Sequence, residues 1–404
     1  MSGGRTAGRT EVAIVGAGPV GLCLANLLAR AGITTILVEA EPALGTDLRA
    51  STFHPPTLDL LDGLGITPRL LAEGLICPSW QIRLHPSGER AVFDMSVLAA
   101  DTRHPYRLQC EQWKLSRALA ERLAGEPAAE LRFATRLLGL EQTPGGVALD
   151  LETPRGRERL DAAVAVGCDG ARSTVRSALR LAFEGVTYPE TTLLATTLFP
   201  FEDHLEGLSN VTYCWKADGN FSLLKVPGRW RVSIYPREDL PIEAQMTPAS
   251  IEASLQEIVG RAEPYEVIET RPYRVHMRIA PGYRVGRAFL AGDAAHVNSP
   301  SGGMGLNGGL HDAFALAECL VGFLRQGEDA ARLDLYDRRR RPVARDEILA
   351  QADRNRARMR EKDPARRRAL LAELQEITAD RGRLRAYLRR SSMIEGLERA
   401  AAIA

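Results

Sequence analysis

Residues 11–30 have the sequence EVAIVGAGPVGLCLANLLAR, and this stretch decides the fold of the chain. A short apolar run rich in β-branched residues leads into Gly16, Gly18 and Gly21, spaced as G-x-G-x-x-G, and a helical pattern rich in Ala and Leu follows. The order of strand, tight turn and helix is typical of a dinucleotide-binding unit. We expect Gly16 to make the turn, Gly18 to let a pyrophosphate approach the backbone, and Gly21 to let helix and strand pack closely. The pyrophosphate would bind the free amide N–H groups at the start of the helix.

The second strand of this unit ends in an acidic residue. The apolar run at 35–38 is followed by Glu39, and Gly32 stops the helix between the two strands. A carboxylate at this position accepts hydrogen bonds from both ribose hydroxyls and repels a 2′-phosphate. A glycine-rich turn with a surface glutamate can arise by chance, but here strand, glycines, helix and acid follow one another in the required order. The sequence therefore predicts a β-α-β unit that binds an adenine dinucleotide.

Composition narrows the class of protein. The chain has 404 residues, which suits two or three domains, and 45% hydrophobic with 25% charged residues is typical of a soluble globular protein. A formal charge of +1 gives no reason to expect nucleic acid or an anionic membrane as a partner. The six cysteines are scattered without any C-x-x-C, so we expect no disulfide framework and no metal site, and a cytoplasmic location. Residues 1–10 are interpreted as a disordered tail, and no apolar run is long enough to span a bilayer.

Two more apolar runs end in glycine and lead into helical patterns. Residues 163–176 read AVAVGCDGARSTVR, with Ser173 as the expected helix cap, and residues 287–296 read RAFLAGDAAH. The glycine-dense stretch 298–309 follows, and an alanine-rich helix is expected to begin near Leu310. Three such transitions in one sheet would place a ligand-binding crevice at the carboxyl ends of the strands.

Together the three motifs resemble those of the FAD-dependent aromatic hydroxylases, which are class A flavoprotein monooxygenases with the p-hydroxybenzoate hydroxylase fold. The resemblance covers about residues 11–345 and rests on the first glycine motif with Glu39, on C-D-G-A-R-S at 168–173, and on G-D-A-A-H at 292–296 with P-x-G-G-x-G-L-N at 300–307. The second and third motifs, at this separation, are highly specific.

The resemblance implies an α/β fold in three parts. A Rossmann-like FAD-binding domain would comprise residues 1–74, 106–184 and 281–330. A mainly antiparallel β-sheet substrate domain would be inserted as residues 75–105 and 185–280, where the first segment is expected to form exposed or edge strands and a helix is expected near 248–260. Residues 331–404 would form a helical region, in which acidic residues interleave with the arginine run 338–341, so we expect a solvated helix face there.

The same resemblance implies a set of cofactor-binding residues. The first glycine motif would cradle the FAD pyrophosphate, Glu39 would hold the adenosine ribose, Asp293 would accept a hydrogen bond from the ribityl chain, and the amides of Leu306 and Asn307 would face the flavin pyrimidine. Asp169 would belong to a fingerprint linked to both FAD and pyridine nucleotide. The full set is Gly16, Gly18, Pro19, Gly21, Glu39, Arg49, Gln112, Asp169, Asp293, Pro300, Gly303, Gly305, Leu306 and Asn307.

Several of these residues have ordinary structural alternatives. Arg49 matches an arginine beside the pyrophosphate, but a loop salt bridge is the competing interpretation. Gln112 matches a glutamine near the ribityl chain, but it would equally serve as a helix cap. His296 and His54 are interpreted as structural rather than as proton-transfer groups.

For the reaction, the resemblance implies that NADH or NADPH reduces FAD and leaves, and that O2 adds at carbon 4a of the flavin. The resulting hydroperoxide would hydroxylate a phenolic or polycyclic aromatic substrate. Only one complete G-x-G-x-x-G unit is evident, so the nicotinamide is expected to bind transiently. Arg and Ala usage is consistent with a bacterial origin, and a monomer or a homodimer is expected.

Neither the substrate nor a catalytic base is readable from the sequence. The polar candidates in the expected substrate sheet are Tyr213, Trp215, Tyr235 and His276, and packing within a strand explains each as well. A halogenase would carry a W-x-W-x-I-P segment, which is missing. A flavoprotein reductase of the same fold and a non-catalytic FAD-binding protein stay open as alternatives.

Overall fold

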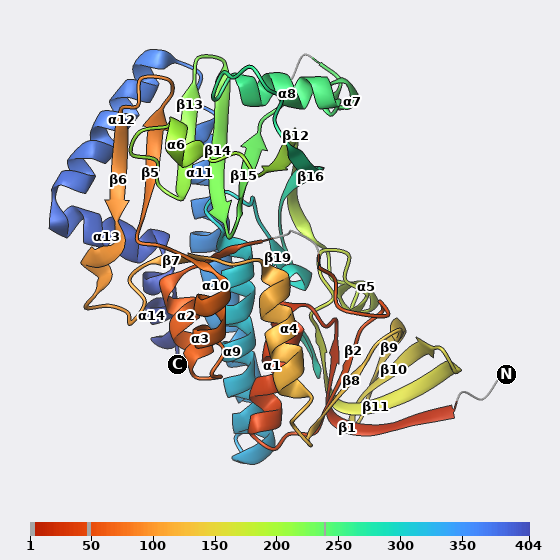
Figure 1. The fold of residues 1–404 in the computed structure, drawn as a ribbon. Helices are drawn as coiled ribbons and strands as arrows, with labels where there is room; N and C mark the ends of the chain where they lie inside the picture. The colour runs from red at the N-terminus through yellow and green to blue at the C-terminus, as the bar shows by residue number, and fades with distance from the viewer. Residues whose placement is uncertain (1–4, 47–49, 238–239) are drawn as a thin grey trace.

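The computed structural model describes residues 5–46, 50–237 and 240–404, and it arranges them as two lobes joined by a C-terminal helical segment (Figure 1). The first lobe is built on a sheet of order β17-β18-β11-β1-β2-β8, with a β9–β10 hairpin continuing from β11. Its strands are β1 (Arg5–Val15), β2 (Thr35–Val38), β8 (Ala129–Arg132), β9 (Arg136–Thr143), β10 (Gly146–Thr153), β11 (Gly156–Gly167), β17 (Arg284–Val285) and β18 (Ala288–Leu290).

The central strands of this sheet are parallel and buried on both faces. Val12 lies beside Val164 of β11 and Thr35 of β2, and helices cover the sheet as its continuous apolar runs require. Helix α1 packs against α4 and α9. The helices of this lobe are α1 (Pro19–Arg30), α2 (Pro55–Asp62), α3 (Thr67–Glu73), α4 (Gln112–Leu123), α5 (Thr174–Ala178) and α9 (Met304–Arg325), with a short 3₁₀ turn η2 (Gly292–Ala294).

Two expectations for this lobe were wrong. Residues 5–10 do not form a disordered tail, because they extend β1 and pair with β11 from Glu158 to Ala162, while residues 1–4 lie outside the described part of the chain. Helix α9 begins at Met304, six residues before Leu310. The first turns of α9 contain glycines where its neighbours leave no space for a side chain. A Cβ on Gly308 would lie 2.6 Å from Ile348.

The second lobe is built on a sheet of order β19-β16-β12-β15-β14-β13-β5-β6. All its neighbouring strands are antiparallel except the parallel pair β13 and β5. Strand β6 is the edge, as expected, but β5 is an interior strand with four buried residues and not an exposed one. The strands are β5 (Ser79–Leu84), β6 (Arg90–Asp94), β12 (Glu184–Thr197), β13 (Val211–Lys216), β14 (Gly219–Val226), β15 (Arg229–Ile234), β16 (Val267–Ile279) and β19 (His296–Val297).

The two faces of the second sheet differ in chemistry. One face is apolar, carries Leu193, Phe221 and Val232, and forms a separate core with Ile251 and Leu255 of α8. The opposite face is polar on β14 and β15, where it carries Ser222 and Ser233, and apolar at its other end, where Trp80, Val211 and Trp215 form a core with leucines of the C-terminal segment. The helices and turns of this lobe are η1 (Met95–Leu98), α6 (Phe201–His204), α7 (Ile242–Gln245) and α8 (Pro248–Gln256), the last in agreement with the helix expected near 248–260.

A small third sheet of order β3-β7-β4 lies where the two lobes meet (Figure 1). Strand β3 (Thr52–Phe53) contacts α9 of the first lobe, whereas β7 (Arg107–Gln109) contacts β14 of the second, and β4 (Leu75–Cys77) pairs with β7. This sheet therefore brings side chains of the first lobe up to the second sheet.

The C-terminal segment is helical, as expected, and it runs from the first lobe to the second. It contains α10 (Ala331–Val343), a π-helical turn η3 (Ala344–Leu349), α11 (Ala350–Met359), α12 (Pro364–Ala379), α13 (Arg381–Ser391) and α14 (Ile394–Ala401). The arginine run is not wholly solvated, because Arg340 is 1% exposed and pairs with Asp312 of α9. No helix among the described residues is both long and apolar enough to cross a membrane. The domain boundaries expected from the sequence stay predictions.

Candidate flavin and substrate site

The first glycine motif forms a turn with one open position. Gly16 has φ +102°, and a Cβ there would lie 2.5 Å from the Cys168 carbonyl oxygen; a Cβ on Gly21 would lie 2.0 Å from the Gly16 oxygen. A Cβ on Gly18 would meet nothing within 4 Å. Gly18 is also the N-cap of α1 and provides no side-chain cap, and Pro19 follows. The turn therefore leaves space and the positive end of a helix for an anion such as a pyrophosphate.

Glu39 lies directly beside this turn. Its Oε2 accepts a hydrogen bond from the Ala17 amide at 2.7 Å, and its Oε1 accepts one from the Glu41 amide at 3.0 Å. The side chain is half-buried, and each carboxylate oxygen keeps a further lone pair. The position at the tip of β2 fits a ribose hydroxyl contact.

The three strands that lead into glycine turns, β1, β11 and β18, end at the same edge of the first sheet, as the sequence predicts. Val15 of β1 is the neighbour of Gly167 of β11, which is the neighbour of Leu290 of β18. The loop after β18 presents Asp293 as an exposed side chain, and Gly292 before it has φ +60°. The motifs that resemble those of flavoprotein hydroxylases thus share one edge of the first sheet.

A buried charge network holds the Asp293 loop. Asp312 is fully buried, and its carboxylate contacts His296 Nε2 at 2.8 Å, Arg340 Nε at 2.8 Å and the Gly292 amide at 3.1 Å. Burial raises the pKa of the Asp312 carboxyl, but His296 and Arg340 outweigh burial and lower that pKa to about 2. His296 therefore braces its loop, in agreement with the structural interpretation.

The second glycine loop is tied to the small third sheet. The Asn307 side chain donates to the carbonyls of Thr52 at 2.9 Å and Gly303 at 2.7 Å, and it accepts the His54 amide at 2.9 Å. His54 Nε2 lies 2.8 Å from the Gly302 carbonyl oxygen, and burial is the main cause that lowers the pKa of His54 to about 3. His54 is thus a neutral, structural histidine.

The loop itself presents backbone and apolar groups. Gly303 has φ +69° and is an N-cap without a side-chain hydrogen bond, so the first amides of α9 are left for an acceptor. Pro300 is exposed, and Leu306 is half-buried in the first turn. A Cβ on Gly305 would lie 3.0 Å from Asn298 Oδ1.

Two expected cofactor residues, Asp169 and Gln112, make contacts within the protein, and a third lies outside the described part of the chain. The Asp169 carboxylate caps α5 through Ser173 Oγ at 2.5 Å and the Thr174 amide at 2.7 Å, and burial raises its pKa. Gln112 is the first residue of α4 and its amide donates to the Ala50 carbonyl, while Glu111 is the N-cap, so Gln112 is not the cap. Arg49 lies outside the described residues. The expected cap Ser173 is confirmed, because its side chain accepts the Arg176 amide.

The polar face of the second sheet carries a row of hydroxyl groups. Tyr213, Ser222 and Ser233 are cross-strand neighbours, and the half-buried Tyr235 and Tyr273 hydrogen-bond through their hydroxyls to Ser222 and Ser233, respectively. Burial raises the pKa of both tyrosines, so they are neutral hydrogen-bonding groups near neutral pH.

This polar face reaches the first lobe through an arginine. Arg231 Nη1 donates to Ser51 Oγ at 3.1 Å, and Ser51 donates to Gln109 Oε1 at 3.1 Å. Arg107 of β7 is buried beside Trp80 and Tyr213. Sequence reasoning missed Arg107 and Gln109 because their strand, β7, has three residues and is too short to show a periodic pattern.

Two of the four residues considered in the substrate sheet lie away from this cluster. His276 bonds to Thr187 in an exposed position where β12 and β16 run between the lobes. Trp215 is buried and donates from Nε1 to the Arg358 carbonyl of α11 at 3.1 Å. Among the described residues no group of His, Cys, Asp and Glu side chains could hold a metal ion.

Comparison with known proteins identifies the family. Residues 9–350 match the family described as FAD binding domain. The chain belongs to this family. The para-nitrophenol 4-monooxygenase of Pseudomonas sp. (strain WBC-3) is 36% identical over 390 residues, which cover 93% of this chain and 94% of the relative. The 6-hydroxy-3-succinoylpyridine 3-monooxygenase HspB of Pseudomonas putida (strain DSM 28022 / S16) is 34% identical over 336 residues, covering 82% of this chain and 85% of the relative.

A solved structure agrees with these relatives. The crystal structure of p-nitrophenol 4-monooxygenase PnpA from Pseudomonas putida DLL-E4 superposes with a TM-score of 0.89 at 32% identity, covering 96% of this chain and 98% of the other. The α/β fold and the resemblance to the FAD-dependent aromatic hydroxylases, both expected from the sequence, are confirmed. The chain is an FAD-dependent enzyme of the aromatic hydroxylase type.

Proposed function

We propose that this hydroxylase uses NADH or NADPH together with O2 to hydroxylate a phenolic aromatic compound. The observation that carries the proposal is that one buried, polar sheet face meets the glycine-rich loops at the ends of the cofactor strands. Arg231 of that face bonds to Ser51, next to the strand whose Thr52 carbonyl accepts from Asn307 of α9. The relatives named as monooxygenases of para-nitrophenol and pentachlorophenol point to a phenol as the substrate.

We further propose how the chain binds its cofactor. The open side of Gly18 and the start of α1 would take the pyrophosphate, Glu39 the ribose, and Asp293 the ribityl chain. The first amides of α9 would lie at the pyrimidine edge of the flavin, where the positive end of the helix favours negative charge. When bound, FAD would carry electrons from the nicotinamide to O2, and O2 would supply the oxygen atom that enters the ring.

The protein's own contribution would be positioning and exclusion of water. The hydroxyls of Tyr213, Tyr235 and Tyr273 sit on this sheet face and would orient a ring oxygen. Burial raises the pKa of Tyr235 and Tyr273, which keeps those two hydroxyls neutral. The C-terminal segment covers this face at β13 and β14, because Trp215 and Asn220 donate hydrogen bonds to carbonyls at the end of α11. A closed polar site of this kind protects a reactive oxygen species from water.

The test begins with the visible absorption spectrum of the purified protein. NAD(P)H oxidation is then followed with phenols, anilines and polycyclic aromatics, and the products are weighed by mass spectrometry. We expect a flavin spectrum, oxidation stimulated by a phenol, and a product heavier by one oxygen atom. Oxidation of NAD(P)H with a reduced organic product and no incorporated oxygen would favour the reductase alternative. A flavin spectrum with no stimulated oxidation by any member would favour a non-catalytic FAD-binding protein.

A further inference from the structure

The start of helix α9 is intrinsically weak. Gly302 has φ +95°, Gly303 has φ +69°, and Gly305 lies in the first turn of the helix. Glycine loses more backbone entropy on ordering than any other residue, and it is a poor helix former. The N-cap Gly303 provides no side-chain hydrogen bond to the first amides. A helix start of this composition should fray unless contacts from outside the helix hold it.

Three successive carbonyls of this loop each lie at hydrogen-bonding distance from a side-chain donor. We call these three contacts the carbonyl clamp. The donors belong to different elements, because one is the N-cap residue of α2, one lies in α9 itself, and one lies in α11. Segments far apart in the sequence therefore hold one loop. The contacts join Asn355 Nδ2 to the Ser301 oxygen at 3.5 Å, His54 Nε2 to the Gly302 oxygen at 2.8 Å, and Asn307 Nδ2 to the Gly303 oxygen at 2.7 Å.

His54 holds the helix start at two points. Its side chain is fully buried, and its Nε2 must carry the ring proton, because the Gly302 carbonyl oxygen can only accept. Its backbone amide donates to Asn307 Oδ1 at 2.9 Å, so it also fixes the side chain that holds the Gly303 carbonyl. Burial is the main cause that lowers the pKa of His54 to about 3, so the ring donates as a neutral group near neutral pH.

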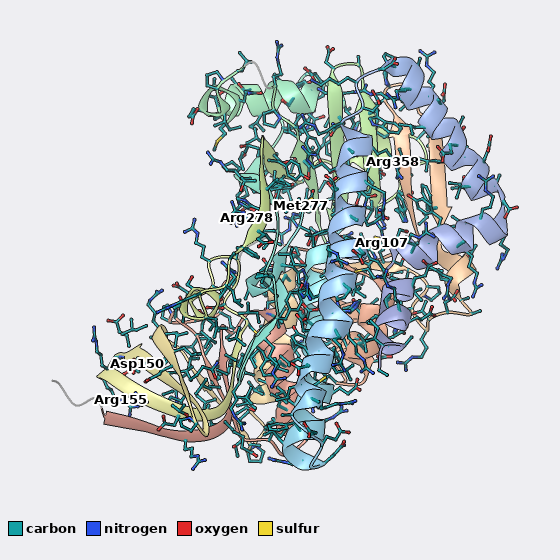
Figure 2. The ribbon with its side chains drawn as sticks, turned by 180° about the vertical axis from the view of Figure 1, so that it is seen from behind. Arg107, Asp150, Arg155, Met277, Arg278 and Arg358 are labelled. Atoms are coloured by element: carbon teal, nitrogen blue, oxygen red, sulfur yellow. The ribbon has the colours of Figure 1, made fainter. Side chains whose placement is uncertain are left out.

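The loop is also packed against its neighbours. A Cβ on Gly302 would lie 2.7 Å from Asn355 Nδ2, and a Cβ on Gly303 would lie 2.9 Å from the Thr52 Cβ of β3. Asn355 is three residues before Arg358, and Figure 2 shows Arg358 at the end of this long helix in the second lobe. The loop is thus in contact with both β3 and α11.

The clamp determines where the amides of the helix start point. A peptide unit is planar and trans, so holding the Gly303 carbonyl also fixes the direction of the Met304 amide. The amides in the first turn of a helix have no acceptor within that helix. They are therefore donors of fixed direction, and donors that are fixed in advance stabilise a negative charge more than donors that must first be ordered.

We propose that His54 is a positioning residue for the flavin, and that it raises the flavin reduction potential by holding the start of α9 in the direction that stabilises the reduced cofactor. This inference rests on the cofactor position given under the proposed function, and it does not involve the aromatic substrate. Reduction adds negative charge to the flavin, so fixed amides at its pyrimidine edge favour the reduced form over the oxidised form. His54 acts through the loop, because the ring is neutral and its Nε2 donates to the Gly302 carbonyl.

The test measures the reduction potential of the FAD-loaded protein against reference dyes, without NAD(P)H and without an aromatic compound. We expect His54→Met to weaken the binding of reduced FAD relative to oxidised FAD by about tenfold, which lowers the two-electron potential by about 30 mV. His54→Gln keeps an amide nitrogen that can donate to the Gly302 carbonyl, and it should restore most of the wild-type value. Asn355→Leu removes the longest contact of the clamp and should weaken the relative binding by about threefold.

His311→Met is the matched control. His311 is a second buried histidine of the first lobe, and burial lowers its pKa well below the usual value. Its Nε2 lies 2.9 Å from Thr57 Oγ1, so it contacts α2 and not the carbonyl clamp. We expect His311→Met to lower the melting temperature about as much as His54→Met and to keep the wild-type potential.

Three results would overturn the inference. The first is a wild-type potential in folded, FAD-loaded His54→Met. The second is an equal fall in His54→Met and His311→Met, which would assign the effect to the packing of the lobe. If His54→Met fails to fold, the half-exposed Asn355 decides, and an unchanged potential in Asn355→Leu is the third.

The inference and the proposed function fail separately. A protein whose potential falls as expected in these variants, but which hydroxylates no aromatic compound, would support the inference and overturn the proposed activity. A protein that hydroxylates phenols, and whose potential is the same in the wild type and in the clamp variants, would overturn the inference alone.

Discussion

The carboxylate of Glu39 accepts a hydrogen bond from the Ala17 amide at 2.7 Å, so the acid that ends β2 also braces the glycine turn that ends β1. One side chain therefore has two partners in the proposed complex, the turn and the ribose. In that complex, the shape of the turn that we propose for the pyrophosphate would depend on the residue that we propose for the ribose.

From this relationship we expect Glu39→Ala to raise the dissociation constant for FAD by roughly tenfold to a hundredfold, because a charged acceptor is lost from both partners. Glu39→Gln should have a smaller effect, since an amide oxygen can still accept from Ala17. Glu41→Ala is the control, because Glu41 is an exposed neighbour that meets Glu39 only through its backbone. Fluorescence titration of the apoprotein with FAD measures all three, and equal affinities for Glu39→Ala and Glu41→Ala would contradict the assignment.

Gly18→Val should abolish FAD binding while leaving the fold intact. Gly18 has φ −68°, which any residue adopts, and a Cβ there meets no protein atom within 4 Å, so the new side chain would fill only the cradle. Gly145→Val, at another glycine with open space, should change neither property. Gly16→Ala should lower the melting temperature instead, because its Cβ would strike the Cys168 carbonyl. Flavin content and thermal melting of the purified variants separate the two effects.

Asp293→Ala should weaken FAD binding, because it removes a carboxylate that is exposed at the edge of the first sheet. Asp293→Asn retains an acceptor oxygen and should bind FAD with intermediate affinity. The measurement is the dissociation constant for FAD alongside the apoprotein melting temperature. Normal flavin content in Asp293→Ala would contradict the proposal that Asp293 binds the ribityl chain of FAD.

Acid should destabilise the protein through Asp312. Its pKa is lowered from an ordinary value near 4 to about 2 in the folded state. The unfolded chain therefore binds the proton first as pH falls, so the stabilisation is complete above about pH 4 and is lost towards pH 2. The contribution is about 2 kcal/mol. Urea unfolding between pH 2 and pH 5 should show this slope in the wild type and a weaker one in Asp312→Asn, which should also be less stable at neutral pH. An equal slope in the variant would assign the acid sensitivity to other carboxyls.

The sequence predicted the parts of the site that depend on local backbone geometry. Gly16, Gly18, Gly21 and Glu39 lie in the turn geometry that their spacing predicts, because turns and helix starts are local, while their contacts with a cofactor stay predictions. Ser173 was predictable as a cap for the same reason. The contacts that join distant segments were not predictable. Arg107 lies in a strand of three residues, and Arg340 belongs to a charged run whose single buried member is decided by the helix it packs against.

The continuous helix from Ala331 to Met359 has a mechanical consequence. One end is pinned to the first lobe by the Arg340–Asp312 pair, and the other end is pinned to the second lobe because Trp215 and Asn220 bond to the carbonyls of Arg358 and Met359. The helix therefore acts as a strut, and swinging one lobe away from the other would break buried bonds at both of its ends. We therefore expect substrate, nicotinamide and product to enter and leave through local movements of loops. The relative position of the two lobes, which sets the distance between the substrate ring and the cofactor, should stay the same throughout the reaction.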